Sequence, residues 1–363
     1  MKVLVVSGIW PPDVGGPASH APEVAAFLAE HGHEPHVLVS ADRAPAPEAY
    51  PVEWIPRASP LRHARAVTRI AALARRADVV YSTGMIGRAG TGALLARTPY
   101  VLKVAGDPAF ERALRRGLTH STLAGFQDER SPATVPLRIV RDAIVGRAAH
   151  VVVPSGFLQE LARGWGAKHV TVLPNPAPAI PATPERDELR ARFGMTGPTL
   201  VFAGRLVEAK ALEVGIEAAR TAGMPLLVAG DGPERGRLEA LGHAHFLGPL
   251  PRREVLDLFR AGDASLLSSN WENFPHGVVE SLAAGTPVVA TAVGGVSEVV
   301  RDGENGLLVA PGDSVALAAA ITRVFSEAGL LDRLRANAAS SVAEYSRDAV
   351  YGRLLDLLLT AAR

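Results

Sequence analysis

The chain has 363 residues, of which 48% are hydrophobic and 21% are charged, and its formal net charge is +1. This length exceeds what a single hydrophobic core usually organises and is typical of two domains. The chain has no cysteine, which excludes disulfide bonds, thiolate metal ligands and a cysteine nucleophile.

Charge is unevenly distributed along the chain. Residues 1–178 carry 20 Lys and Arg against 14 Asp and Glu, a net of +6, whereas residues 179–363 carry 18 against 23, a net of −5. A basic half favours an anionic acceptor or a membrane face, although a solvated Arg-rich surface has the same composition. The Arg-rich stretch at 57–76 has no interleaved aromatic residues, so nucleic acid is not an expected partner.

The first half alternates short apolar runs with Ala-rich helical patterns. The N-terminal run is ended by Pro11, Pro12 and Asp13, too early for a signal peptide, and no window reaches the ~20 apolar residues that cross a bilayer. We therefore expect a soluble, cytoplasmic protein with no transmembrane segment. A helix is predicted at 18–32, and strands are predicted at 2–8, 33–40, 77–84, 100–106 and 149–155.

A Pro-rich segment, PNPAPAIPATPER at 174–186, interrupts this alternation and is the predicted linker. The alternation then restarts, with strands predicted at 199–205, 225–232, 243–250, 264–269, 286–292 and 305–311, before a mostly helical stretch from about 314. Apolar runs separated by helices indicate an α/β fold with parallel sheets covered on both faces. The predicted domains are 1–178 and 179–345, with a helix at 346–363 packing back toward the N-terminal domain.

Arg205 and Lys210 lie in FAGRLVEAK, at the junction between a predicted strand and a helix. Two cations beside helix N–H groups suit a diphosphate, although a surface lysine at an ordinary loop has the same pattern. Glu272 and Glu280 are eight residues apart, and the second begins a predicted helix. Carboxylates accept hydrogen bonds from vicinal sugar hydroxyls, whereas an isolated pair of acids is more often a solvated surface.

Two Gly-rich turns follow predicted strands, GGP at 15–17 and GGVSE at 294–298. Successive backbone N–H groups in such turns form anion-binding nests, but either could be a plain turn. Asp107, in KVAGDP, could touch the sugar or could cap the next helix. Neighbouring Lys103 is a potential partner or an edge charge. No Asp-x-Asp or His/Asp cluster indicates a metal site.

Together these motifs resemble the retaining glycosyltransferases of family 4, the glycogen synthase or group 1 type, and the resemblance covers nearly the whole chain. Its most specific element is E-x7-E at Glu272 and Glu280, followed by SLAAGTPVVATAVGGVSEVV, and GRLVEAK and GGPASH match the family's phosphate-binding segments. The resemblance implies the GT-B fold, in which two Rossmann-like parallel-sheet α/β domains face a central cleft. It also implies transfer of a sugar from a nucleotide diphosphate to a hydroxyl acceptor, with retention and without a metal or other cofactor.

By this resemblance Arg205 and Lys210 hold the donor diphosphate, Glu280 binds the ribose and Glu272 binds the transferred sugar. The implied catalytic residues are Arg205, Lys210, Glu272 and Asp107. The implied donor-binding residues are Gly15, Gly16, Arg205, Lys210, Gly248, Leu250, Glu272, Asn273, Phe274, Pro275, His276, Gly277 and Glu280.

The sequence departs from the family pattern at two places. Pro275 and His276 stand where many members have Gly after the Phe of E-x-F-G, and KVAGDPAFER stands where many members carry a His near the sugar. The family resemblance favours a UDP-sugar donor, with a GDP-sugar next. Two alternatives stay open, a nucleotide-sugar epimerase on the same fold and a catalytically silent nucleotide-sugar binding protein.

The acceptor is expected to be a small molecule, a saccharide or a lipid-linked hydroxyl compound. We expect the loops at 43–66 and 107–135 of the N-terminal half to bind and select the acceptor. Their arginine content leaves a phosphorylated acceptor or peripheral membrane contact open.

Overall fold

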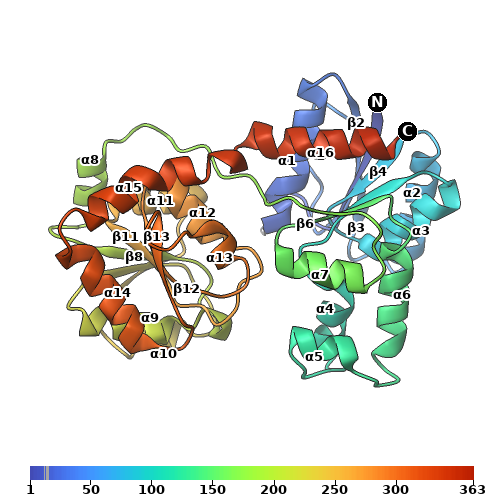
Figure 1. The fold of residues 1–363 in the computed structure, drawn as a ribbon. Helices are drawn as coiled ribbons and strands as arrows, with labels where there is room; N and C mark the ends of the chain where they lie inside the picture. The colour runs from blue at the N-terminus through green and yellow to red at the C-terminus, as the bar shows by residue number, and fades with distance from the viewer. Residues whose placement is uncertain (12, 14–15) are drawn as a thin grey trace. The chain divides into compact units, whose positions relative to one another are not determined.

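The computed structural model describes residues 1–11, 13 and 16–363, with the side chains of residues 16–19 left aside. The chain divides into two compact units (Figure 1). The first unit comprises Met1–Pro174 and Val350–Arg363, and the second comprises Asn175–Ala349. Both termini therefore belong to the first unit.

A seven-stranded parallel sheet forms the centre of the first unit, in the order β3-β2-β1-β4-β5-β6-β7. The strand order reverses between β1 and β4, which is where ligands usually bind in sheets of this kind, outside the carboxyl ends of the strands. The strands are β1 (Lys2–Ser7), β2 (Glu34–Ala41), β3 (Val52–Pro56), β4 (Val79–Ser82), β5 (Tyr100–Lys103), β6 (His150–Val153) and β7 (Val170–Val172).

Alternate residues of each strand point to opposite faces of this sheet, and both faces are buried. Leu4 and Val6 belong to one apolar cluster, whereas Val3 and Val5 belong to the other. Burying each such side chain stabilises the fold by roughly 1.5–3 kcal/mol before entropy is counted. The sheet therefore needs helices on both sides, as the continuous apolar runs of the sequence predict.

The helices of the first unit include the end of the chain. Tyr351 of the last helix packs its ring 5.6 Å from that of Phe27 and donates a hydrogen bond to Glu23 Oε2 at 2.8 Å. The helices are α1 (Gly16–Glu30), α2 (Arg62–Ala74), α3 (Ile86–Ala96), α4 (Pro108–Arg115), α5 (Leu123–Asp128), α6 (Val135–Val145), α7 (Gly156–Gly164) and α16 (Arg347–Ala361).

The second unit has a six-stranded parallel sheet in the order β10-β9-β8-β11-β12-β13, with the reversal between β8 and β11. Its strands are β8 (Leu200–Ala203), β9 (Leu226–Ala229), β10 (Ala244–Gly248), β11 (Ala264–Leu267), β12 (Val288–Thr291) and β13 (Gly306–Val309). Its helices are α8 (Arg186–Arg192), η1 (Glu208–Lys210), α9 (Leu212–Thr221), α10 (Arg235–Glu239), α11 (Arg252–Ala261), α12 (His276–Ala283), α13 (Val296–Val299), α14 (Ser314–Ser326), α15 (Leu330–Ser341) and η2 (Ala343–Tyr345).

The predicted α/β class with parallel sheets is confirmed, but two strands, β3 and β7, were not predicted from the sequence. Strand β3 lies inside the segment expected to be a loop at 43–66, and the segment at 107–135 contains α4 and α5. Strand β3 is at the sheet edge and Trp54 is 38% exposed, so it lacks the continuous apolar run of a central strand. Among the described residues no single helix is long and apolar enough to cross a membrane; the bent pair Ser314–Ser326 and Leu330–Ala361 passes that test only jointly.

Candidate active site

The predicted donor-binding residues of the second unit lie on loops that follow the carboxyl ends of its strands. Lys210 follows β8 and Glu272 follows β11, so the two flank the point where the strand order reverses. Backbone hydrogen bonds join these loops, because Asn270 N donates to Ala209 O at 3.0 Å. The geometry is that of a ligand-binding edge of a parallel sheet.

Lys210 and Glu272 form an ion pair between Nζ and Oε1. Ser269 Oγ also donates to Glu272 Oε1 at 2.7 Å. The Glu272 side chain is 10% exposed and that of Lys210 is 25% exposed. Removing either partner would leave a largely desolvated charge without its ion-pair partner, which usually costs about 3–5 kcal/mol.

Arg205 has a different environment from Lys210, although both follow β8. Its side chain is exposed and makes no hydrogen bond or ion pair within the part of the chain that the structure describes. The structure thus places Arg205 on the same loop as Lys210 without a contact between them. Its guanidinium group is available to an anionic ligand.

Glu280, on α12, pairs with a residue that the sequence did not single out. Arg252 Nη1 lies 3.0 Å from Glu280 Oε1, and the Glu280 side chain is 14% exposed. Burial raises the pKa of Glu280, and the charge and hydrogen bond of Arg252 offset part of that rise. Arg252 is the first residue of α11, two residues after Leu250, which the family resemblance implies as a donor-binding residue.

The Gly294–Gly295 pair packs directly against the backbone of the Glu272 loop. A Cβ atom on Gly294 would lie 1.8 Å from Glu272 O, and one on Gly295 would lie 2.5 Å from Asn273 O. Gly294 also has a φ of 48°, in the left-handed region that glycine tolerates best. Close approach therefore explains why two glycines stand here, and Gly295 N donates to Glu272 O at 3.2 Å.

The residues between the two glutamates anchor the loop to the second unit. Phe274 is buried and its ring lies 6.3 Å from that of Tyr345. His276 Nε2 lies 3.1 Å from Asn175 Nδ2. Pro275 immediately precedes α12, and a Cβ on Gly277 would lie 3.4 Å from Ala203 O. The Pro275–His276 departure from the family pattern is thus accommodated at the start of a helix.

Gly248 is the last residue of β10 and Leu250 follows it, at the same edge. Gly248 O accepts a hydrogen bond from Gly230 N at 2.8 Å, and Leu250 packs on the apolar cluster around Leu258. Gly230 in turn approaches the loop of Arg205, since its Cβ would lie 1.8 Å from Gly204 O. The segment at 229–236 therefore fixes the position of the Arg205 loop through backbone contacts.

Asp107 of the first unit caps a helix, which is one of the two roles that its sequence left open. Its Oδ1 caps α4 by accepting from Ala109 N at 2.8 Å, and its Oδ2 pairs with Arg141 Nη1 at 2.5 Å. The Asp107 side chain is fully buried. These contacts fit the capping role. The catalytic role that the family resemblance implies for Asp107 stays a prediction.

Two glycines and two buried titratable residues complete the description of the first unit. Gly15 lies outside the described residues, and Gly16 is the first residue of α1. His20 is buried and its Nε2 lies 2.9 Å from Tyr81 Oη, which fits a core histidine. Lys103 is buried, and burial lowers its pKa to about 7.

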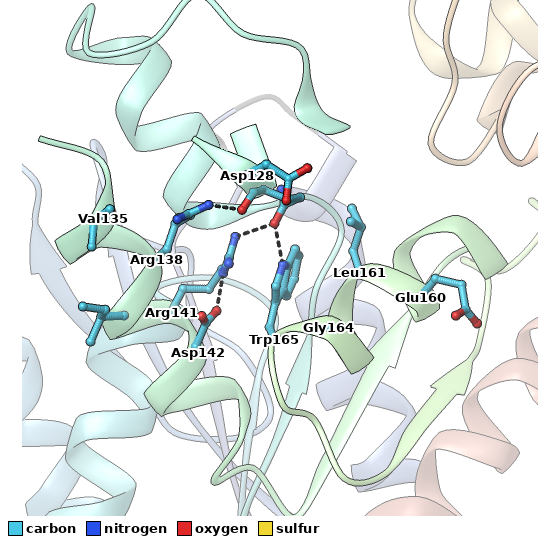
Figure 2. Close-up of a pocket in the computed structure, with 11 residues that line it drawn as sticks. Asp128, Val135, Arg138, Arg141, Asp142, Glu160, Leu161, Gly164 and Trp165 are labelled. Carbon is cyan, nitrogen blue, oxygen red and sulfur yellow. Dashed lines mark hydrogen bonds and ion pairs between the residues drawn. The ribbon is translucent and has the colours of Figure 1, made fainter. Parts of the chain in front are cut away.

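A pocket of about 390 Å³ lies on the first unit among α5, α6 and α7. Figure 2 shows Arg141 and Trp165 converging on it, with Trp165 Nε1 donating to Gln127 Oε1 at 2.9 Å. The guanidinium of Arg141 lies 4.4 Å from the centre of the Trp165 ring. Because Gln127 and Arg141 also hold Asp107, the wall of this pocket is part of the same buried polar network.

The chain matches two family models over most of its length. Residues 15–176 match the glycosyl transferase 4-like domain, and residues 185–341 match glycosyl transferases group 1. The chain belongs to the GT4-type glycosyltransferases. Glycogen synthase of Mycobacterium tuberculosis is 28% identical to it over 93% of this chain and 89% of that protein.

Other glycosyltransferases match more narrowly in sequence or only in fold. D-inositol 3-phosphate glycosyltransferase of Thermomonospora curvata is 34% identical over 47% of this chain and 45% of that protein. The Anabaena structure Alr3699/HepE superposes with a TM-score of 0.77 at 21% identity, covering 99% of this chain and 100% of that one. This glycosyltransferase therefore has the GT-B fold.

No group of three or more His, Cys, Asp or Glu side chains that could hold a metal ion occurs in the described part of this glycosyltransferase. The carboxylates at the edge of the second sheet are instead paired with cations. What the site offers a ligand is a set of positive groups and hydrogen-bond acceptors on adjoining loops.

Proposed function

We propose that this chain is a retaining glycosyltransferase that transfers the sugar of a UDP-sugar to a hydroxyl acceptor and releases UDP. The observation that carries the proposal is the pairing of Lys210 with Glu272 and of Arg252 with Glu280 at one edge of the second sheet. A nucleotide sugar presents a diphosphate and vicinal hydroxyls, and these need cations and carboxylates in close proximity.

The choice of UDP is supported by structures of similar fold. The Anabaena protein Alr3699/HepE was solved with UDP and with UDP-glucose. A GDP-sugar is the next candidate. The base would be recognised largely by backbone groups around Gly248 and Leu250, with little selection by side chains. The backbone there is held by the Gly230–Gly248 hydrogen bond.

Arg205 and Lys210 are proposed to hold the diphosphate of the donor. Cleavage of the sugar–phosphate bond develops negative charge on the leaving oxygen, and pre-positioned cations stabilise that charge. Lys210 is oriented in advance by Glu272, whereas Arg205 has no such partner in the described residues. With two cations in this role, we propose that no metal is needed.

Glu272 and Glu280 are proposed to accept hydrogen bonds from the hydroxyls of the transferred sugar and of the ribose, respectively. When the diphosphate engages Lys210, its pairing with Glu272 weakens and Glu272 gains capacity for the sugar. Arg252 would keep Glu280 ionised despite its burial.

Retention is proposed to proceed by attack on the same face that the leaving group departs from. The bond between the anomeric carbon and the diphosphate oxygen breaks, and a bond to the acceptor oxygen forms. The acceptor's proton goes to the departing phosphate oxygen. Glu272 and Glu280 are each held by a cation, so neither is offered as a nucleophile.

The acceptor is proposed to be a hydroxyl compound, a saccharide, a small molecule or a lipid-linked sugar. The names of two relatives, D-inositol 3-phosphate glycosyltransferase and 2-deoxystreptamine glucosyltransferase, support small polyols. A cytoplasmic location stays a prediction.

The proposal is tested by incubating the protein with UDP-, GDP-, ADP- and dTDP-sugars in the presence of EDTA. We expect hydrolysis or transfer with a UDP-sugar, and an anomeric proton in the NMR spectrum of the product that keeps the donor's configuration. Inversion would contradict the retaining mechanism. Activity that returns only when a divalent metal is added would contradict the proposal that the reaction needs no metal.

A further inference from the structure

A cluster of arginines lies at the carboxyl edge of the first sheet. Arg62 begins α2, which follows β3; Arg88 is in the first turn of α3, which follows β4; and Arg112 is on α4, which follows β5. Carboxyl ends of parallel strands meet at one edge of a sheet, so the three come from neighbouring connections. The reversal of strand order between β1 and β4 is at the same edge.

Close backbone packing marks this reversal point. A Cβ on Gly84, after β4, would lie 2.8 Å from the backbone N of Gly8, after β1. Arg57 Nη2 donates to Gly8 O at 2.7 Å, and Arg62 Nη1 donates to Arg57 O at 2.6 Å. The arginine cluster is thereby tied to the rigid end of the sheet.

The cluster lacks acidic partners within the described residues. Arg57 pairs with Asp42 at 2.5 Å, and Arg69, on the same helix as Arg62, pairs with Glu53 at 2.5 Å. In contrast, no carboxylate lies within ion-pair distance of Arg62, Arg88 or Arg112 among those residues. Their positive charge is therefore balanced by solvent or by a ligand.

The arginines of the cluster are close enough to shift the pKa values of neighbouring groups. Burial, followed by the positive charges of Arg112, Arg62 and Arg57, lowers the pKa of Arg88. Burial, followed by Arg88, Arg62 and Arg112, lowers the pKa of His63. Arg62 and Arg112 thus act on both Arg88, in α3, and His63, in α2.

An apolar hollow adjoins the cluster. A pocket of about 50 Å³ is lined by Gly87 of α3, Ala109 and Arg112 of α4, and Val140 of α6. Val140 is 56% exposed. A ligand bound at the cluster would therefore have both a cationic and an apolar surface beside it.

We propose that Arg62, Arg88 and Arg112 bind a phosphoryl group carried by the acceptor substrate. Guanidinium groups donate paired hydrogen bonds that match phosphate oxygens, and neighbouring arginines without a carboxylate partner suit a dianion better than a single carboxylate. This inference rests on the proposed function, because it names the class of acceptor that the transferase would use. The donor diphosphate is assigned to a different set of cations, Arg205 and Lys210.

The test uses the full chain saturated with UDP, so that the donor site is filled, and inorganic diphosphate as the probe in calorimetric titrations. We expect one diphosphate to bind per chain. Arg88→Gln and Arg112→Gln should each weaken its binding by about tenfold or more, since each removes a charged hydrogen bond. Absence of diphosphate binding while UDP still binds would overturn the inference and leave the proposed function intact.

Arg75→Gln is the matched control, because Arg75 is exposed at the opposite end of the helix that Arg62 begins. Diphosphate should bind this variant as tightly as the wild type. Equal weakening in Arg75→Gln and Arg112→Gln would show diffuse attraction to a basic surface and would overturn the proposed site. Arg112 is exposed, so its substitution leaves the fold intact, and UDP binding to every variant checks the second unit separately.

A second experiment distinguishes two sources of the phosphoryl group, a lipid headgroup and a free phosphorylated acceptor. Sedimentation with vesicles of phosphatidylcholine, alone or mixed with phosphatidic acid, measures binding to a lipid phosphate. Binding to the acidic vesicles that is lost in Arg88→Gln and Arg112→Gln assigns a lipid source. Diphosphate binding without vesicle binding assigns a free phosphorylated acceptor, and vesicle binding that is unchanged in both variants contradicts the site.

Discussion

The two sheets of this protein balance positive charge at their carboxyl edges in opposite ways. In the second unit, Lys210 is paired with Glu272 and Arg252 with Glu280, and Arg205 is an exception with no ion pair among the described residues. In the first unit, Arg88 and Arg112 have no carboxylate within ion-pair distance among the described residues, and the cations repel one another.

This difference indicates what each edge is built to receive. A nucleotide sugar needs cations for its diphosphate and carboxylates for its hydroxyls, so a charge-balanced edge suits it and stays ordered before the donor arrives. An edge with excess positive charge stores electrostatic repulsion that an anionic ligand relieves. The acceptor is then the substrate expected to bring the missing negative charge.

The largest effect is expected from Lys210→Ala, which breaks the balanced edge. Turnover should fall by about 10²–10³-fold, because one group that stabilises the departing diphosphate is lost. Glu272 would also remain desolvated and unpaired. Steady-state rates measure this, with Lys168→Ala as the exposed control. Turnover within twofold of wild type would remove Lys210 from the reaction.

The close approach beneath Glu272 is tested by Gly294→Ala. The new Cβ would lie 1.8 Å from Glu272 O, whereas Gly303, which also has a positive φ, has nothing within 4 Å. Gly294→Ala should therefore cost at least about 2 kcal/mol more in the free energy of unfolding than Gly303→Ala, and should weaken UDP binding. Equal effects in denaturant unfolding would show that close packing does not hold this loop.

Lys103 provides a contrast with Lys210, because it is buried without an ion pair among the described residues. Its pKa is lowered by burial from 10.5 to about 7, so between these values the unfolded chain binds more protons and wild-type stability rises with pH. Lys103→Met should remove this rise and increase the free energy of unfolding at pH 7 by about 1–4 kcal/mol. A variant that is less stable at pH 7, or that keeps the rise, would show that the lysine is stabilised by contacts in the fold.

The smallest effect is expected from acid titration of Glu280. Burial raises its pKa above 4.5, so it protonates at higher pH than an ordinary glutamate and then accepts hydroxyl hydrogen bonds more weakly. UDP-glucose affinity should fall as pH decreases through that raised pKa. Glu280→Gln should bind more weakly at neutral pH and lose this dependence. A pH profile of binding that is the same in both proteins would assign the titration to another group.

The sequence predicts the central strands well because their burial on both faces leaves continuous apolar runs. Strand β1 (Lys2–Ser7) and strand β9 (Leu226–Ala229) are examples, each flanked by Ser or Gly. Strands β3 and β7 were not predicted, since both are at a sheet edge where part of each strand is exposed. The two glutamates and Lys210 stood out through their spacing and neighbours, and the structure brings Lys210 and Glu272 together.

What the sequence could not supply is pairing between distant positions. Arg252 lies 28 residues before Glu280, and only the packing of α11 beside α12 brings them within 3.0 Å. Asp107 was equally ambiguous, because a capping carboxylate and a substrate-binding one have the same local sequence. Its partners, Arg141 and Gln127, are 34 and 20 residues away.

The most direct test of this account is calorimetric titration of UDP-glucose, without metal, into the wild type, Glu280→Ala and the double variant Arg88→Gln/Arg112→Gln. We predict one site in the wild type, binding weakened at least about tenfold in Glu280→Ala, and unchanged affinity in the double variant. Wild-type affinity in Glu280→Ala, or loss of UDP-glucose binding in the double variant, would contradict the assignment of the donor to the charge-balanced edge.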